Sequence, residues 1–123
     1  MRTNQELFDI GIAGIRAQGF LARRGGGDCF YRMALPNGLG PKTRLSCVIG
    51  MSIADKDYDP NWDAEGGDGV SGRIIARVLG WSASPDFVDA LQALHDGADG
   101  VDDLVAKAKT LGLVWKLDVS VCS

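Results

Sequence analysis

V-W-K-L-D-V-S-V, residues 114–121, is the stretch that decides the predicted fold. Apolar and polar side chains alternate along it without a break. The apolar ones fall on one face: Trp115, Leu117, Val119 and Val121. Strict alternation is typical of a β-strand with one buried face. Because the backbone groups of a strand need hydrogen-bonding partners, other strands must lie beside it. We therefore predict a C-terminal strand over about residues 114–122.

Two further stretches alternate in the same way and would supply those partners. They are residues 29–35, C-F-Y-R-M-A-L, and residues 45–53, L-S-C-V-I-G-M-S-I. The connection between them contains Asn37-Gly38 and Pro41, which are turn formers. A hairpin with a long loop is the economical interpretation. The three strands together predict a mostly antiparallel sheet.

Four segments show the apolar spacing of helices instead. They are expected over residues 4–18, 71–79, 84–96 and 99–111. The first begins with a capping box, in which Thr3 is followed three residues later by Glu6. The third begins with Ser84-Pro85-Asp86, a strong helix start. The prediction is one α+β domain over residues 1–123, with about four helices in a single layer on one face of the three-stranded sheet.

Gly11 and Gly14 lie three residues apart on one side of the first predicted helix. Glycine within a helix costs about 1 kcal/mol relative to alanine, so each position needs a reason. A missing side chain most often serves close packing. We expect the sheet to approach the helix backbone at these two positions.

Composition and charge narrow the function classes. The chain has 123 residues and a net charge of −3, and its basic clusters are short, at residues 23–24 and 42–44. Nucleic-acid binders need clustered Lys and Arg, so nucleic acid is not the expected partner. No stretch approaches the roughly 18 apolar residues of a membrane span, and the N-terminus does not resemble a secretory signal. We expect a protein with reduced thiols in a bacterial or host cytosol.

The candidate metal or redox residues are Cys29, Cys47 and His95. The two cysteines fall on the apolar faces of adjacent predicted strands, and with the histidine they would supply three zinc-type ligands. Paired C-x₂₋₄-C spacing is absent from the chain. Core packing is therefore the preferred interpretation, a disulfide or redox pair the second and a metal the third. No cofactor and no catalytic residue is predicted, because no catalytic motif is present.

The segment after the second predicted strand offers candidate binding residues. Asp55, Asp57 and Asp59 occupy alternate positions, as in a calcium loop, but Pro60 and Gly66 stand where such a loop needs glycine and glutamate. A surface turn is therefore the better interpretation. Aromatic side chains on loops are typical binding anchors, and this chain has three, at Tyr58, Trp62 and Trp81. The alternative is that each closes the edge of the core.

Several phrases together are similar to a known group of proteins. They are T-N-Q-E-L-F-D (3–9), D-C-F-Y-R (28–32), S-C-V-I-G-M-S-I (46–53), D-K-D-Y-D-P (55–60) and L-Q-A-L-H-D (91–96). The order resembles small, uncharacterised bacteriophage and prophage proteins. The chain departs from that group at Met51, where a second cysteine is usual, and after Gly112, where the final strand is an addition. The resemblance implies a phage setting and a cytoplasmic location.

Three functions follow as hypotheses. The first is a non-catalytic phage accessory protein that binds a host or phage protein, as an inhibitor of bacterial antiviral defence in the manner of anti-CRISPR proteins. The second is a small-ligand binder or sponge with a pocket between the sheet and the segment from Trp62 to Trp81. The third is a metal or redox protein built on Cys29, Cys47 and His95. A homodimer would be allowed by pairing of the C-terminal strand between chains.

Overall fold

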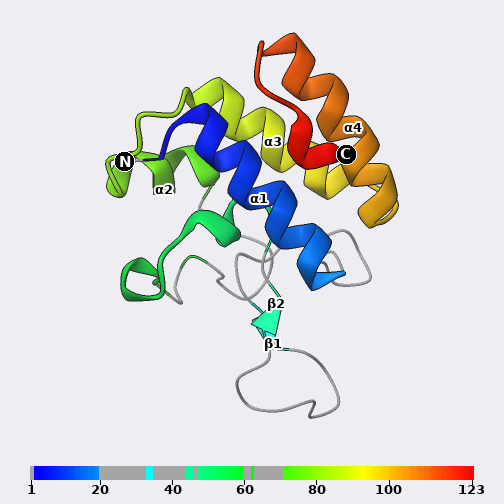
Figure 1. Ribbon diagram of the computed structural model, residues 1–123. Helices are drawn as coiled ribbons and strands as arrows, with labels where there is room; N and C mark the ends of the chain where they lie inside the picture. The colour runs from blue at the N-terminus through cyan, green and yellow to red at the C-terminus, as the bar shows by residue number, and fades with distance from the viewer. Residues whose placement is uncertain (1, 20–32, 35–43, 46, 60–61, 63–70) are drawn as a thin grey trace.

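The computed structural model describes residues 2–19, 33–34, 44–45, 47–59, 62 and 71–123 (Figure 1). Its helices are α1 (Asn4–Gln18), α2 (Gly72–Val78), α3 (Pro85–Gly97) and α4 (Val101–Val114). Short 3₁₀ turns are η1 (Gly50–Ser52), η2 (Asp55–Asp57) and η4 (Ser120–Cys122), and the strands are β1 (Met33–Ala34) and β2 (Arg44–Leu45). No helix in the described part of the chain is long and apolar enough to cross a membrane.

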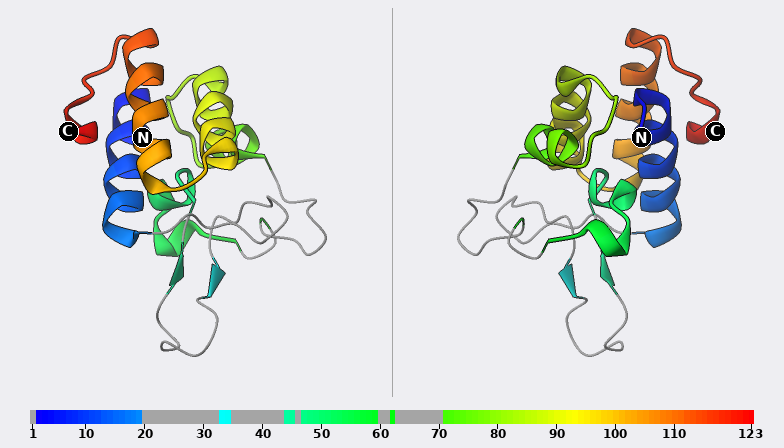
Figure 2. Two further views of the ribbon diagram at one scale, coloured as in Figure 1. Left: turned by 90° about the vertical axis from the view of Figure 1, so that its right-hand side faces the viewer. Right: turned by 90° about the vertical axis from the view of Figure 1, so that its left-hand side faces the viewer.

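The helices make the body of the molecule. Helix α3 packs against α2 and α4, and α4 packs against α1 (Figure 2). The capping box predicted for α1 is confirmed, since Glu6 N donates to Thr3 Oγ1 at 3.1 Å and Thr3 N donates to Glu6 Oε1 at 3.2 Å. The largest fully buried side chains come from all the helices and from residues 48–49: Phe8, Phe87, Leu7, Ile12, Ile15, Ile49, Ile75, Leu91, Leu104, His95, Val48 and Val88.

The predicted α+β fold with a three-stranded sheet is wrong, because the described chain is helical. Among the described residues, β-pairing is confined to the antiparallel contact of β1 with β2, in which Met33 faces Leu45. Figure 1 shows this contact below the helices. Of the predicted strand at 29–35, only residues 33–34 lie within the described part of the chain. The described residues contain no three-stranded sheet for a layer of helices to cover.

The burial of residues 47–53 explains why their alternating pattern wrongly predicted a strand. Cys47, Val48 and Ile49 are all fully buried, so burial here is continuous instead of two-sided. The backbone turns helically, with Met51 N donating to Cys47 O at 3.0 Å. The segment packs against α1, and Ile49 lies beside Gly72 of α2. It is this segment that approaches the backbone of α1 at Gly11, where the prediction expected the sheet.

The predicted C-terminal strand is also wrong, although its two-sided burial is real. Trp115, Leu117, Val119 and Val121 are half-buried, whereas Lys116, Asp118 and Ser120 between them are exposed. Helix α4 continues to Val114, and the tail then folds back over α1 and α4 (Figure 1). The tail therefore offers no strand through which two chains could pair.

Side chains of α1 satisfy the backbone of the tail in place of neighbouring strands. Gln5 Nε2 donates to Asp118 O at 3.0 Å, and Asp118 N donates to Gln5 Oε1 at 2.9 Å. Arg16 Nη1 donates to the carbonyl oxygens of Val121 at 2.8 Å and Ser123 at 2.6 Å. Within the tail, the hydrogen bond from Ser120 N to its carboxylate holds the pKa of Asp118 below the ordinary value.

Two helices end in the same hydrogen-bonded turn, the Schellman motif. At the end of α2, Trp81 N donates to Ala76 O and Gly80 N donates to Arg77 O. At the end of α4, Leu117 N donates to Gly112 O and Lys116 N donates to Leu113 O. The motif places one residue in the left-handed region, which glycine adopts without strain. That residue is Gly80 in the first case, with φ 70°, and Lys116 in the second, with φ 58°.

Lys116→Gly is accordingly expected to stabilise the protein by about 0.5–1 kcal/mol, because it removes the cost of a Cβ in the left-handed region. Gly80→Ala is the matched reverse change, since a Cβ at Gly80 meets nothing within 4 Å and adds only the backbone cost. Urea denaturation followed by circular dichroism measures both. A Lys116→Gly variant less stable than the parent would contradict the expectation.

Candidate functional site

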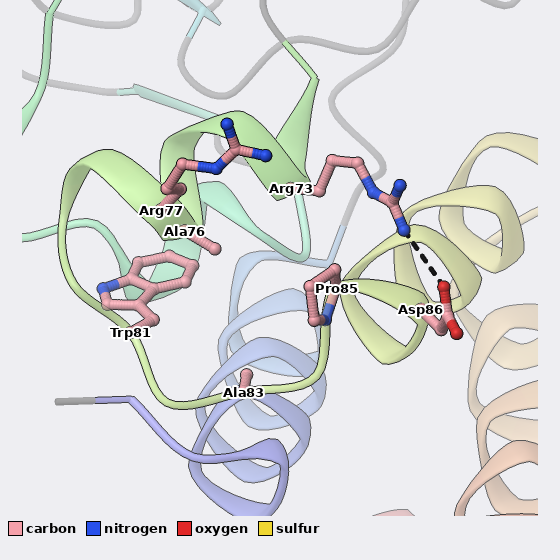
Figure 3. A pocket seen from close by; sticks show the side chains of 7 residues that line it. All are labelled: Arg73, Ala76, Arg77, Trp81, Ala83, Pro85 and Asp86. Atoms are coloured by element: carbon pink, nitrogen blue, oxygen red, sulfur yellow. Dashed lines mark hydrogen bonds and ion pairs between the residues drawn. The ribbon is translucent and has the colours of Figure 1, made fainter.

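A surface hollow lies between α2 and the start of α3, with a volume of about 470 Å³ (Figure 3). We call it the α2–α3 hollow, and its lining residues are Arg73, Ala76, Arg77, Trp81, Ala83, Pro85 and Asp86. Volumes of this size are typical of sites that accept a small molecule or a few side chains of a partner. The hollow combines aromatic, apolar and charged groups within one short stretch of sequence.

The floor of the hollow is apolar and held in place by the N-terminal segment. Ala76 and Ala83 are buried, at 4% and 7% exposure. The loop carrying Ala83 is fixed from outside, since Ala83 N donates to Arg2 O at 3.0 Å and Ser84 N donates to Asn4 Oδ1 at 2.8 Å. Arg2, two residues before α1, and Asn4, the first residue of α1, thus hold the floor in place. Asn4 lies 80 residues before Ser84 in the sequence.

One wall of the hollow is a pair of salt bridges between α2 and α3. Arg73 Nη2 lies 3.0 Å from Asp86 Oδ1, and Arg73 Nε lies 2.9 Å from Asp89 Oδ2. All three side chains are substantially exposed, so each pair adds little to stability. Their effect is positional: the guanidinium of Arg73 is held at the edge of the hollow by two carboxylates (Figure 3).

The opposite wall is formed by Trp81 and Arg77 (Figure 3). Trp81 directly follows Gly80, and the Schellman turn sets its indole beside Ala76 at the end of α2. Arg77 is exposed, and within the described part of the chain its guanidinium has no hydrogen bond or ion pair. Ile74 and Val78, on the same helix, leave 46% and 65% of their surface exposed. Helix α2 therefore carries exposed apolar surface in addition to its two arginines.

Of the aromatic residues predicted as binding anchors, Trp81 is the one that lines the hollow. Tyr58 and Trp62 contact each other instead, in an edge-to-face pair with ring centroids 6.2 Å apart. Trp62 is buried, at 9% exposure, and belongs to the core cluster. The acidic candidates lie elsewhere: Asp55 and Asp57 are exposed on η2, and Asp59 is half-buried. These five side chains do not line the hollow.

Sequence reasoning missed the charged part of the hollow. Arg73 and Arg77 received no role, and Pro85 and Asp86 were interpreted only as a helix start. A signal was present, because Arg73, Arg77 and Trp81 follow one another at intervals of four residues. On a helix this spacing puts side chains on one face, so the pattern could have indicated a shared surface.

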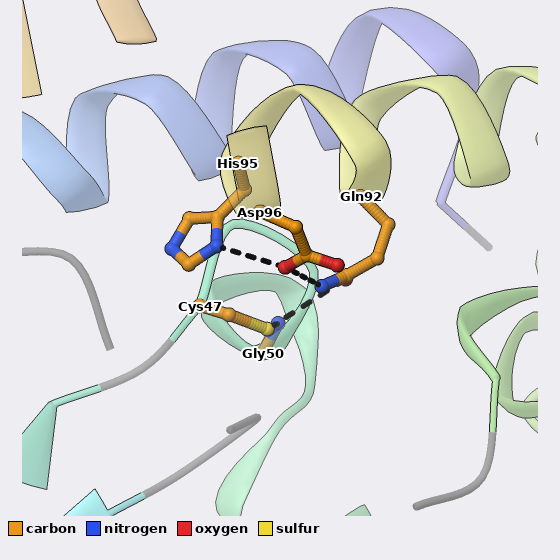
Figure 4. A network of polar contacts seen from close by, with 5 residues as sticks. All are labelled: Cys47, Gly50, Gln92, His95 and Asp96. Atoms are coloured by element: carbon orange, nitrogen blue, oxygen red, sulfur yellow. Dashed lines mark hydrogen bonds and ion pairs between the residues drawn. The ribbon is translucent and has the colours of Figure 1, made fainter. Parts of the chain in front are cut away.

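A second group of polar contacts joins residues 47–50 to α3 (Figure 4). Gly50 N donates to Cys47 Sγ at 3.3 Å, and the thiol lies 3.8 Å from Gln92 Oε1. Gln92 Nε2 donates to Asp96 Oδ1 at 3.1 Å, and the same oxygen lies 3.5 Å from His95 Nδ1. Cys47 and His95 are both fully buried. The network ties the turn to the helix inside the core.

The candidate metal ligands are only partly covered by the structure. Cys29 lies outside the described residues, while Cys47 and Cys122 are free thiols. Burial raises the pKa of the Cys122 thiol. In the part of the chain that the structure describes, no group of three or more His, Cys, Asp or Glu side chains is placed to hold a metal ion.

Comparison with other proteins adds no assignment to this geometry, and the resemblance to phage proteins stays a prediction. No family model, no curated protein and no solved structure matches the chain.

Proposed function

We propose that this protein acts by binding another protein, with the α2–α3 hollow at the centre of the contact surface. The observation that carries the proposal is the half-exposed Trp81 beside an unengaged Arg77 on a fixed frame. Tryptophan and arginine are the residues most enriched among those that dominate binding energy at protein interfaces. Helix α2 also carries exposed apolar area at Ile74 and Val78.

The frame of the hollow supports this role. Its floor is tied to residues 2–4, and its Arg73 wall is tied to α3 by two ion pairs. A partner would therefore meet a surface already in its binding shape. Ordering side chains on association costs about 0.5–1.5 kcal/mol for each long one, and pre-organisation reduces that cost.

The biological setting of the proposal comes from the sequence. The phrases that resemble small bacteriophage and prophage proteins, including D-C-F-Y-R (28–32), support a location in the cytosol of an infected bacterium. We propose that its partner there is a host protein and that binding inhibits an antiviral defence, as anti-CRISPR proteins do. In this proposal the protein blocks its target by occupancy and performs no reaction.

Affinity capture from bacterial lysate tests the proposal. The protein is expected to retain a stoichiometric partner, and Trp81→Ala is expected to weaken that complex at least tenfold, or about 1.4 kcal/mol. Lys109→Ala serves as the control, because Lys109 is an exposed cation on α4, outside the hollow. Circular dichroism verifies that each variant is folded. A partner retained equally by the parent and Trp81→Ala would overturn the choice of surface.

A small-molecule ligand is the second candidate function, because the volume of about 470 Å³ lies in the range of ligand sites. Native mass spectrometry of protein purified from infected cells would show a retained compound as a mass increment. Loss of that increment in Trp81→Ala would support this alternative over a protein partner. An unaltered protein mass would count against it.

A further inference from the structure

We infer that the α2–α3 hollow accepts an acidic segment of a partner protein, in which a carboxylate pairs with Arg77 and an adjacent apolar side chain lies against Trp81. This inference rests on the proposed function and names the chemistry of the partner. It is carried by the distribution of charge and apolar surface around the hollow.

Among the described residues, Arg77 is the cation of the hollow that no carboxylate neutralises. Arg73, Arg77 and Asp86 line the hollow and Asp89 pairs with Arg73 at its edge, so these charges balance on a protein whose net charge is −3. The cations also cluster on one helix, since Arg73 and Arg77 are four residues apart on α2. A negatively charged group therefore meets an unpaired cation here on a protein that is acidic overall.

The two arginines differ in how much of their charge and how many of their hydrogen-bond donors remain for a ligand. Arg73 already contacts Asp86 through Nη2 and Asp89 through Nε. Its positive charge is thus largely balanced by its neighbours. Arg77 has no such contact among the described residues, and its guanidinium retains all of its donors. A carboxylate can form two parallel hydrogen bonds with a guanidinium in this state.

Apolar surface beside Arg77 selects for a second, uncharged group. The hollow has Ala76, Ala83 and Pro85 as its floor and Trp81 as its side (Figure 3). An aliphatic or aromatic side chain that covers the indole would also remove water from around Arg77. Desolvation strengthens the ion pair beyond the small value of an exposed one.

These two requirements favour a protein segment over a nucleic acid. A nucleic acid presents a phosphate at every nucleotide and needs several clustered cations. Among the described residues, the hollow offers one uncommitted arginine together with the apolar surface of Trp81 and the floor. An acidic residue next to an apolar one in an extended or helical segment matches that arrangement.

Nuclear magnetic resonance titration with synthetic peptides tests the inference. The probes are an acidic hexapeptide, acetyl-Glu-Asp-Leu-Phe-Asp-Glu-amide, its neutral Gln/Asn isostere, and an acidic peptide with Ser in place of Leu and Phe. The first is expected to shift the Trp81 indole signal and to bind at least fivefold more tightly than the other two. Raising NaCl from 50 to 500 mM should weaken its binding, since salt screens the pair.

Matched variants assign the effect to Arg77. Arg77→Gln is expected to abolish the preference for the acidic over the neutral peptide, whereas Lys109→Gln removes the same charge from α4 and should leave it unchanged. Equal binding of the acidic and neutral peptides, or no Trp81 shift with any probe, would overturn the inference. Self-association that Arg77→Gln abolishes would also overturn it, by showing that a second copy occupies the hollow.

The outcomes separate this inference from the function on which it rests. A captured partner that depends on Trp81 but not on Arg77, with no charge preference among the peptides, would refute the acidic segment and leave protein binding intact. A captured partner that depends on neither residue would refute both.

Discussion

Gly11→Ala is expected to lower the free energy of unfolding by about 1–3 kcal/mol, even though alanine is the better helix former. A Cβ at Gly11 would lie 2.6 Å from Val48 Cγ2 and 2.8 Å from the carbonyl oxygen of Val48. The second contact is with backbone inside a fully buried segment, so it cannot be relieved by a side-chain rotation. Either α1 or residues 47–49 must shift. Urea denaturation followed by circular dichroism measures the loss.

Gly14→Ala is the matched control on the same face of α1. A Cβ there would lie 2.6 Å from Met51 Sδ and 2.8 Å from Met51 Cγ. Both atoms belong to a flexible side chain that is only half-buried, so it can move aside. The change should stay within about 1 kcal/mol of the parent, because the gain in helix propensity offsets the rearrangement. Equal losses for the two variants would mean that the backbone of Val48 is not the obstacle.

Phe87→Ala is expected to have the largest effect, a loss of about 3–5 kcal/mol in the free energy of unfolding. Phe87 is fully buried on α3 and forms an edge-to-face pair with Trp115, with ring centroids 5.2 Å apart and planes at 73°. The substitution therefore leaves a cavity and removes an aromatic contact that joins α3 to the end of α4. Thermal and urea denaturation both report the change.

A double-mutant cycle separates the two parts of that loss. Trp115→Leu in the parent and in Phe87→Leu removes the aromatic pair while keeping apolar volume at both positions. The coupling energy between the rings is expected to be about 0.5–1.5 kcal/mol. A loss below 1 kcal/mol for Phe87→Ala would show that Phe87 is not at the centre of the core.

The helices could be predicted because their signals are local. Thr3 and Glu6 form the expected capping box, and Pro85 occupies the first turn of α3. Each signal depends on residues within one turn of the helix, which the sequence shows directly. The predicted ranges 4–18 and 84–96 accordingly agree with α1 and α3 to within a residue at each end.

The strands could not be predicted from alternation, because alternation reports burial and not backbone conformation. Leu117 and Val119 are partly buried and Asp118 is exposed, as a strand would require. Yet no strand pairs with this described segment, and its long-range hydrogen bonds come from the side chains of Gln5 and Arg16, which lie more than 100 residues earlier. Sequence patterns do not show that such distant side chains can replace a neighbouring strand.

Only part of the hollow could be predicted from the sequence. Trp81 attracts attention as an aromatic residue just after a helix stop, and its role in binding stays a prediction. The floor depends on Ala83, whose position is set by Arg2, and the wall depends on Arg73 meeting Asp86 and Asp89. These are tertiary contacts between residues that carry no motif of their own. Sequence spacing alone offered only the intervals of four residues that join the arginines to Trp81.

Arg2 forms hydrogen bonds with two separate segments of the molecule. Its carbonyl oxygen accepts from Ala83 N under the hollow, and its Nε donates to the carbonyl oxygen of Ser52 in the buried turn. Because Arg2 joins the two, a partner that immobilises the loop at Ala83 also restrains the turn at Ser52. Binding of a partner at the hollow is then expected to slow amide exchange around residues 50–53, which do not line the hollow.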